Sequence, residues 1–82
     1  MFHKIKSVKA AESYCLLVEF ETGEYRVYDV KNMAQQFPVF QLLFSESELF
    51  SQVKVDQGGY GISWNDELDI SCNELWEHGI EA

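Results

Sequence analysis

The sequence predicts one small α+β domain, in which a mostly antiparallel β-sheet of five to six strands carries short helices on one face. Three observations support this: short runs of alternating apolar and polar residues, a glycine turn between two runs, and two Ser-x-x-Glu motifs that typically begin helices. We expect the order β-β-β-α-β-β-α in a single domain over residues 1–82, because a chain of 82 residues provides only one core.

The first third of the chain predicts three strands. Residues 4–11 are lysine-rich, which favours an edge strand, since charge discourages pairing with another molecule. From Tyr14 to Phe20 apolar residues begin on both faces, which is typical of a central strand. The segment ETGE at 21–24 contains a glycine and leads into a third strand from Tyr25, so the second and third strands form a hairpin.

The middle of the chain predicts short helices. Asp29 or Asn32 caps the first, which Pro38 ends. Ser45 and Glu48 have capping-box spacing and predict a second helix from 46 to about 51. Between the two helices we expect an irregular turn that presses five apolar residues onto the sheet: Phe37, Val39, Phe40, Leu42 and Leu43.

The last third predicts further strands and a final helix. A strand at 52–56 leads into a glycine turn that permits positive φ, and the alternation of Ile62 and Trp64, then Leu68 and Ile70, places these four side chains in the core. Ser71 and Glu74 form a second capping box. The helix after it is predicted to pack through a stripe of residues at helical spacing: Cys72, Leu75 and Trp76. Gly79 is predicted to end this helix in a left-handed turn.

The net charge is strongly negative, with 6 basic against 14 acidic residues and a net charge of −8. Such a chain repels nucleic acid at long range, so nucleic acid is an improbable sole partner and a basic protein suits the charge better. Lys4, Lys6 and Lys9 nevertheless leave open a third hypothesis, a nucleic-acid-associated regulator.

The motifs that carry catalysis are missing from the sequence. The glycines at 58, 59 and 61 lack a Walker lysine and a following helix, no serine lies in a GxSxG elbow, and His3 and His78 lack metal-site spacing. His78 is expected to contact free carbonyls of the last helical turn, and Cys15 and Cys72 to be reduced, buried thiols. We therefore predict no catalytic residue, no cofactor and no metal ligand; the protein is not expected to be an enzyme.

A binding surface is the remaining candidate function. The aromatic residues exceed the needs of a small core, and acidic residues cluster between 66 and 69. The N-terminus lacks an export signal and no segment has transmembrane length, so we expect a cytoplasmic location and no membrane contact. The candidate interaction surface comprises six residues: Trp64, Asp66, Glu67, Asp69, Phe37 and Tyr60.

Several segments together resemble a family of small bacterial domains of unknown function, DUF2442: DV at 29–30, LF at 49–50, VKVD at 53–56, GISWNDELDIS at 61–71 and ELWEHG at 74–79. Members commonly have Trp-Pro-Asn-Gly-Ala-Asp where this chain has WNDELD, so Trp64 and Asp69 correspond while the proline and glycine are missing. The resemblance implies an α+β fold in the bacterial cytoplasm, without an established activity.

Members of that family are often encoded beside another small protein in an arrangement that looks like a toxin–antitoxin pair, and some are fused to a helix-turn-helix, for which we expect no room in this chain. The leading hypothesis is a non-enzymatic protein–protein interaction module, antitoxin-like, whose partner is a small basic protein encoded nearby. The alternative is a small-molecule or metal-binding domain that uses the sheet near Trp64, Asp69 and Cys72. A homodimer through an aromatic patch or a sheet edge stays open.

Overall fold

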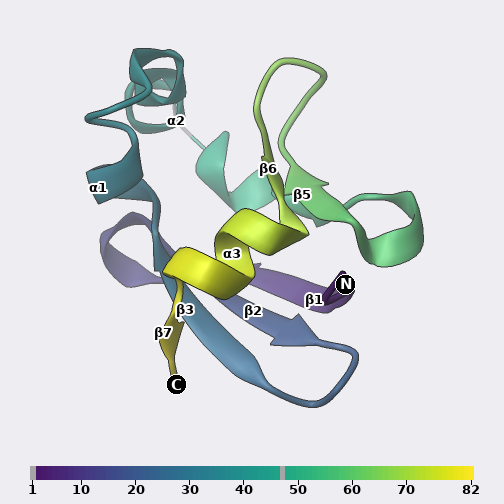
Figure 1. Ribbon diagram of the computed structural model, residues 1–82. Coiled ribbons are helices and arrows are strands. Elements are labelled where there is room, and N and C mark those ends of the chain that lie inside the picture. Colours follow the sequence, from purple (N-terminus) through teal and green to yellow (C-terminus); the bar gives the residue numbers. More distant parts are fainter. Residues whose placement is uncertain (1, 47) are drawn as a thin grey trace.

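The computed structural model describes residues 2–46 and 48–82 and has a mixed α+β fold with two antiparallel sheets (Figure 1). The first sheet has the order β1-β2-β3-β7, and the second has the order β4-β5-β6. The strands are β1 (Ile5–Ala10), β2 (Cys15–Phe20), β3 (Tyr25–Asp29), β4 (Lys54–Val55), β5 (Gly61–Ser63), β6 (Asp69–Ser71) and β7 (Ile80–Glu81). The α-helices are α1 (Val30–Met33), α2 (Leu42–Ser45) and α3 (Cys72–His78).

Four short 3-10 helices complete the described elements: η1 (Glu12–Tyr14), η2 (Pro38–Gln41), η3 (Phe50–Gln52) and η4 (Gln57–Gly59). The predicted α+β class and the block order of strands and helices are confirmed. The division into two sheets was not predicted, because the alternation of apolar residues shows which segments are strands but not which strands pair. The final strand β7 was also missed, since two exposed residues show no alternation.

The first sheet follows the sequence pattern closely. β1 lies at the edge and β2 in the interior, as predicted. Leu16, Val18 and Phe20 on one face of β2 are fully buried, because alternate residues of a strand point to the same side. The turn between β2 and β3 places Gly23 at a φ of +94°, a conformation that glycine adopts without a steric penalty.

The middle segment differs from the prediction. Asp29 caps α1 as expected, because its carboxylate accepts a hydrogen bond from the backbone N–H of Asn32 at 3.0 Å. Ser45, however, ends α2 and donates its hydroxyl to the carbonyl of Leu42 at 3.4 Å. Glu48 has a φ of +69°, which no α-helix allows, so the predicted helix from 46 to 51 is wrong; residue 47 lies outside the described residues.

Packing explains this error. Leu43 and Phe50 are both buried, so the chain forms one short helical turn before Ser45 and another after Leu49 to place both side chains in the core. The capping motif lies in the connection between them, where tertiary packing outweighs a local hydrogen-bond preference.

The expected burial of the apolar residues after α1 is only partly correct. Phe40 and Leu43 join the core. Phe37, Val39 and Leu42 are 54%, 47% and 45% exposed, because the 3-10 turn and short helix bury only one side of the segment.

The end of the chain confirms the last helix but not its ending. The Ser71 hydroxyl accepts a hydrogen bond from the N–H of Glu74 at 3.2 Å, and Cys72 and Leu75 are buried while Trp76 is half-buried. Gly79 has a φ of −75° and ψ of 156°, so the predicted left-handed turn is wrong. Lack of space explains why this residue is a glycine, because a Cβ atom there would lie 2.5 Å from the carbonyl oxygen of Leu75.

The turns between the short strands also match the sequence. Gly58 and Gly59 have φ values of +85° and +81° in the turn between β4 and β5, as the glycine turn predicts. The four alternating residues all lie in the core; they are Ile62, Trp64, Leu68 and Ile70. One continuous cluster of buried residues joins both sheets, and Trp64 belongs to it.

Trp64 connects the second sheet to the middle segment. Its indole N–H donates a hydrogen bond to the carbonyl oxygen of Phe50 at 2.9 Å, and its ring lies 6.0 Å from that of Phe50 and 6.2 Å from that of Phe40. The indole therefore supplies both apolar area and the partner that a buried carbonyl requires.

We predict that Trp64→Phe lowers the free energy of unfolding by about 2–3 kcal/mol, because the carbonyl of Phe50 loses its donor and the core loses volume. Trp76→Phe is the matched control, since it makes the same change in a half-buried ring, and should cost about 1 kcal/mol. Urea unfolding followed by the fluorescence of the remaining tryptophan measures both. Equal losses would show that the hydrogen bond of Trp64 contributes little.

Candidate functional site

Two adjoining hollows are lined by residues of the α1–η2 segment on one side and of α3 and β6 on the other. Their volumes are about 430 and 210 Å³, and they share Tyr28, Met33, Phe37 and Glu74. We call the combined surface the acidic groove. It is lined by Val27, Tyr28, Asp29, Asn32, Met33, Gln36, Phe37, Phe40, Asp69, Ile70, Ser71, Glu74, His78 and Ile80.

The interior of the groove centres on a hydrogen bond between two elements that are distant in sequence. Tyr28 on β3 is 3% exposed, and its hydroxyl donates to Oε2 of Glu74 on α3 at 2.8 Å. Burial, together with this carboxylate, raises the pKa of Tyr28 well above its ordinary value. The phenol is therefore neutral at any physiological pH and serves as a fixed donor.

Glu74 also fixes the far end of the groove. Its Oε1 atom lies 3.1 Å from Nδ1 of His78, one helical turn further on. His78 therefore contacts a carboxylate and not the free carbonyls of the last turn, contrary to our expectation. The capping box is only half formed for a related reason, since the Glu74 carboxylate turns toward Tyr28 and His78 and away from Ser71.

Apolar side chains form the rims of the groove. Phe37 at the N-terminal end of η2 is 54% exposed, and Ile80 on β7 is 71% exposed. Met33 is half-buried and lines both hollows. Exposed aromatic and aliphatic side chains around a concave surface are characteristic of binding sites.

The charge of the groove has one sign. Three acidic residues line it: Asp29, Asp69 and Glu74. None of its lining residues is Lys or Arg, and His78 is the one lining side chain that can become cationic. The groove therefore presents negative potential beside apolar area.

The six residues of the predicted interaction surface do not form one surface. Phe37 and Asp69 both line the acidic groove. Trp64 is 5% exposed and packs in the core, so its inclusion was wrong. Asp66 and Glu67 are exposed on the loop between β5 and β6, outside the groove lining.

Tyr60 lies in a different environment. Its ring contacts that of Phe2 at 5.3 Å, and the ammonium group of Lys4 lies 5.2 Å from its centre. It is 48% exposed at the turn that precedes β5, and it does not line the groove. Sequence reasoning grouped it with Trp64 because both were counted among aromatic residues in excess of the needs of a small core.

Sequence reasoning missed most residues of the groove, among them Tyr28, Glu74, His78 and Ile80. Tyr28 was read as one of several surplus aromatics and Glu74 as a helix cap. The available signal was the pairing of an acidic residue with a histidine four positions later, which places both on one helix face. Nothing in the sequence connects that face to β3.

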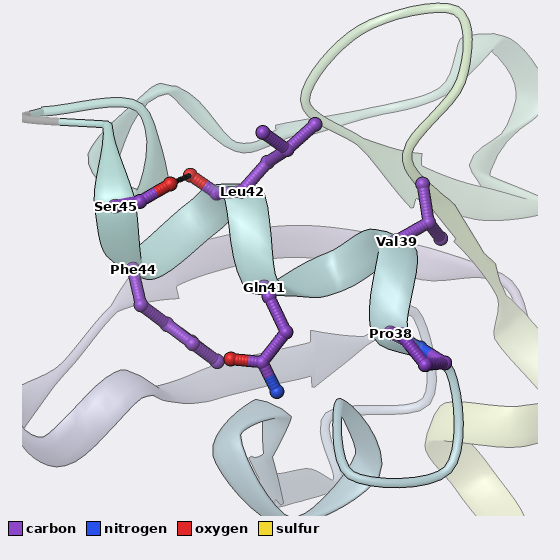
Figure 2. Close-up of a pocket in the computed structure, with 6 residues that line it drawn as sticks. All are labelled: Pro38, Val39, Gln41, Leu42, Phe44 and Ser45. Atoms are coloured by element: carbon purple, nitrogen blue, oxygen red, sulfur yellow. Dashed lines mark hydrogen bonds between the residues drawn. The ribbon is translucent and has the colours of Figure 1, made fainter.

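A third hollow, of about 440 Å³, is lined by residues of η2 and α2 (Figure 2). Val39 and Leu42 point to one side of this segment and Gln41 and Phe44 to the other, as Figure 2 shows. No charged residue lines it, so its chemistry does not indicate an occupant.

The site expected for a small molecule or metal ion does not assemble. Trp64 and Cys72 are 5% and 1% exposed, so neither offers its side chain to a ligand beside Asp69. Within residues 2–46 and 48–82, no group of three or more His, Cys, Asp or Glu side chains is arranged to hold a metal ion. Cys72 is buried as predicted, whereas Cys15 is half-buried; both are free thiols.

The three lysines of the nucleic-acid hypothesis all lie on the solvent side of β1 or just before it. Lys6 forms an ion pair with Glu19 at 3.8 Å, and Lys4 lies over the ring of Tyr60. Lys9 is exposed further along the same strand. A small basic stripe is thus present on a surface formed by different elements from those of the groove.

Comparison with protein families matches residues 5–81 to the family described as "Protein of unknown function (DUF2442)". The chain belongs to the DUF2442 family. The resemblance drawn from GISWNDELDIS and the other segments is thereby confirmed, although it assigns no activity to the domain. Among curated proteins no match is found.

A solved structure shares this DUF2442 fold. It is the crystal structure of the "Putative DNA Binding Protein NE0471" from Nitrosomonas europaea, with a TM-score of 0.75 and 22% sequence identity. The match covers 92% of this chain and 47% of that one, so the domain spans about half the length of its structural relative. At this identity the similarity concerns the fold.

In the part of the chain that the structure describes, no helix has the length and apolar character needed to cross a bilayer.

We predict that Tyr28→Phe lowers the free energy of unfolding by about 1–2 kcal/mol at neutral pH, because Glu74 loses a buried donor. The raised pKa of Tyr28 adds a pH dependence: its stabilising contribution is complete below the unfolded pKa of about 10 and is lost as pH rises toward the higher folded value. Wild type should therefore lose stability above pH 10 more steeply than the variant.

Cys15 also contributes to the change of stability with pH in that experiment. Burial and the charge of Asp29 raise its pKa, so it adds an alkaline decline of the same sign to both proteins. Urea titrations at several pH values from neutral to alkaline measure the difference. Parallel curves for wild type and Tyr28→Phe would contradict the assigned role of the hydroxyl.

Proposed function

We propose that this DUF2442 domain is a non-enzymatic protein–protein interaction module whose acidic groove binds a basic, partly apolar segment of another protein. The observation that carries the proposal is the composition of the groove. Three acidic residues and exposed apolar side chains line it, and no Lys or Arg does.

The two kinds of side chain have different roles in such binding. Phe37 and Ile80 offer apolar area that is exposed in the free domain, and its removal from water supplies affinity. The carboxylates of Asp29 and Asp69, within a chain of net charge −8, attract a basic partner and fix its orientation.

The interior of the groove is organised before any partner arrives. Tyr28 and Glu74 already satisfy each other, and Asp29 already caps α1. A partner therefore orders few side chains when it binds, which lowers the entropic cost of association.

The partner that suits this groove is a small basic protein, in keeping with the two-gene, antitoxin-like arrangement that the family resemblance implies. An antitoxin-like role needs tight association with one partner, and the apolar rims support such association better than charge alone.

We expect Phe37→Ser to weaken binding of the partner by at least about tenfold while changing the stability of the domain little, because the ring is more than half exposed. Tyr60→Ser is the matched control: it removes an aromatic ring of similar exposure, 48%, from a surface outside the groove. Co-expression with the product of the neighbouring gene, followed by affinity capture and calorimetry, measures both.

Equal losses of affinity in the two variants would show that the groove is not the binding surface. Independent migration of the two wild-type proteins in size-exclusion chromatography at micromolar concentration would count against the proposed partner.

A second candidate function is nucleic-acid association through β1. Lys4, Lys6 and Lys9 share its solvent side, and a structural relative with 22% identity is named a putative DNA binding protein. Neutralisation of phosphates by these lysines requires steep salt dependence.

On this second reading, we expect weak duplex DNA binding at low ionic strength, and loss of that binding on replacement of Lys4, Lys6 and Lys9 by Gln. Fluorescence anisotropy with labelled DNA over a salt series provides the measurement. DNA binding that persists unchanged in the triple variant, or that is absent even without added salt, excludes β1 as the contact.

A further inference from the structure

We propose that the partner segment binds the acidic groove in extended form, as an additional antiparallel β-strand along the free edge of β6. This inference rests on the proposed function and specifies its mode of recognition. In the added strand, a basic residue would lie opposite Asp69 and an apolar residue opposite Ile70.

The hydrogen-bonding pattern of the second sheet shows which groups of β6 are free. The backbone N–H of Trp64 donates to the carbonyl of Leu68, and that of Cys72 donates to Tyr60, both at 2.9 Å. Between these pairs Ile62 lies opposite Ile70. In an antiparallel ladder such pairs recur at every second residue, so the polar backbone atoms of Ile70 point toward β5.

Asp69 and Ser71 therefore direct their backbone polar groups away from β5. The pairing of β5 with β4 independently supports this assignment. The N–H of Asp56, which follows β4, donates to the carbonyl of Gly61, and Gly61 lies opposite Ser71 of β6. The strand order is β4-β5-β6, and among the described residues no strand pairs with the outer side of β6.

This outer edge is one wall of the acidic groove. All three residues of β6 line the smaller hollow, together with Phe37, Phe40 and Glu74. The Ser71 carbonyl accepts the first hydrogen bond of α3 as part of the N-cap. An incoming strand would therefore use the N–H and carbonyl of Asp69 and the N–H of Ser71.

Side-chain direction defines the sequence that suits this edge. Ile70 is 6% exposed and points into the core, while Asp69 and Ser71 are exposed on the opposite face. In an added strand the residue opposite Ile70 would enter the 210 Å³ hollow beside Phe37 and Phe40. The residue opposite Asp69 would face its carboxylate, so a Lys or Arg is favoured there.

An extended partner explains the groove better than a helical one. A helix satisfies its own backbone and would leave the outward groups of Asp69 unused, whereas strand addition combines main-chain hydrogen bonds with pockets for alternate side chains. Exposed edges also recruit unwanted strands, and β6 is short and charged at Asp69, which limits its partners to basic segments.

The probe is a fluorescein-labelled peptide, acetyl-Gly-Lys-Val-Lys-Val-Lys-Gly-amide, titrated with the full chain and followed by anisotropy. Two analogues carry the same number of N-methyl groups, either on lysines or on valines. The residue opposite Asp69 exchanges hydrogen bonds with it, so methylation of the lysine nitrogens should weaken binding at least about tenfold more than methylation of the valine nitrogens.

Two variants of the protein test the same contact from the other side. Asp69→Pro removes the outward N–H, which a strand edge tolerates because no hydrogen bond within the sheet is lost, while Asp69→Asn removes only the charge. Asp69→Pro should bind the peptide about tenfold more weakly than Asp69→Asn. Thermal unfolding confirms that both variants are folded. The comparison of the two methylated peptides on the wild-type protein tests the same contact without any protein variant.

Equal binding of the two methylated peptides would overturn strand addition, as would absence of binding of the unmethylated peptide at about 1 mM. If methylation has no positional effect but Phe37→Ser still weakens binding of the co-expressed partner, the inference fails and the proposed function stands. If Phe37→Ser does not weaken binding of the co-expressed partner, the proposed function is contradicted.

Discussion

The packing of two small sheets onto a single core is the constraint on which the rest of this structure depends. The second sheet is too small to bury its own apolar face, since its strands have only two or three residues. Trp64 connects the second sheet to the intervening segment by contacting Phe50 and Phe40 and by satisfying a buried carbonyl. The middle segment is therefore shaped by the core and not by its own helix signals.

The same constraint produces the acidic groove. Only one side of the segment between α1 and α2 is needed to fill the core, so Phe37 remains on the surface while Phe40 is buried. The final helix crosses to the first sheet, where Glu74 meets Tyr28, and β7 then pairs with β3. The groove lies between the parts of the chain that close the core from two sides.

The groove combines a hydrogen-bonded interior with apolar rims. Tyr28 and Glu74 hold each other in fixed positions, and the raised pKa of Tyr28 keeps the phenol protonated as a donor. Its free backbone groups lie along one wall at β6, whereas Phe37 and Ile80 define its apolar rims. In the proposed interaction, affinity and orientation would therefore come from different elements of one surface.

The sequence by itself determined the α+β class, the central strand with Leu16 and Val18, the glycine turns, and the start of the last helix at Ser71, because these depend on alternation, φ preference and capping within a few residues. It also identified Phe37 and Asp69 as surface candidates. The tertiary structure alone decided that Glu74 meets Tyr28, 46 residues away in the chain. Local patterns report which face of an element is apolar, but the partner of that face is chosen by the whole core.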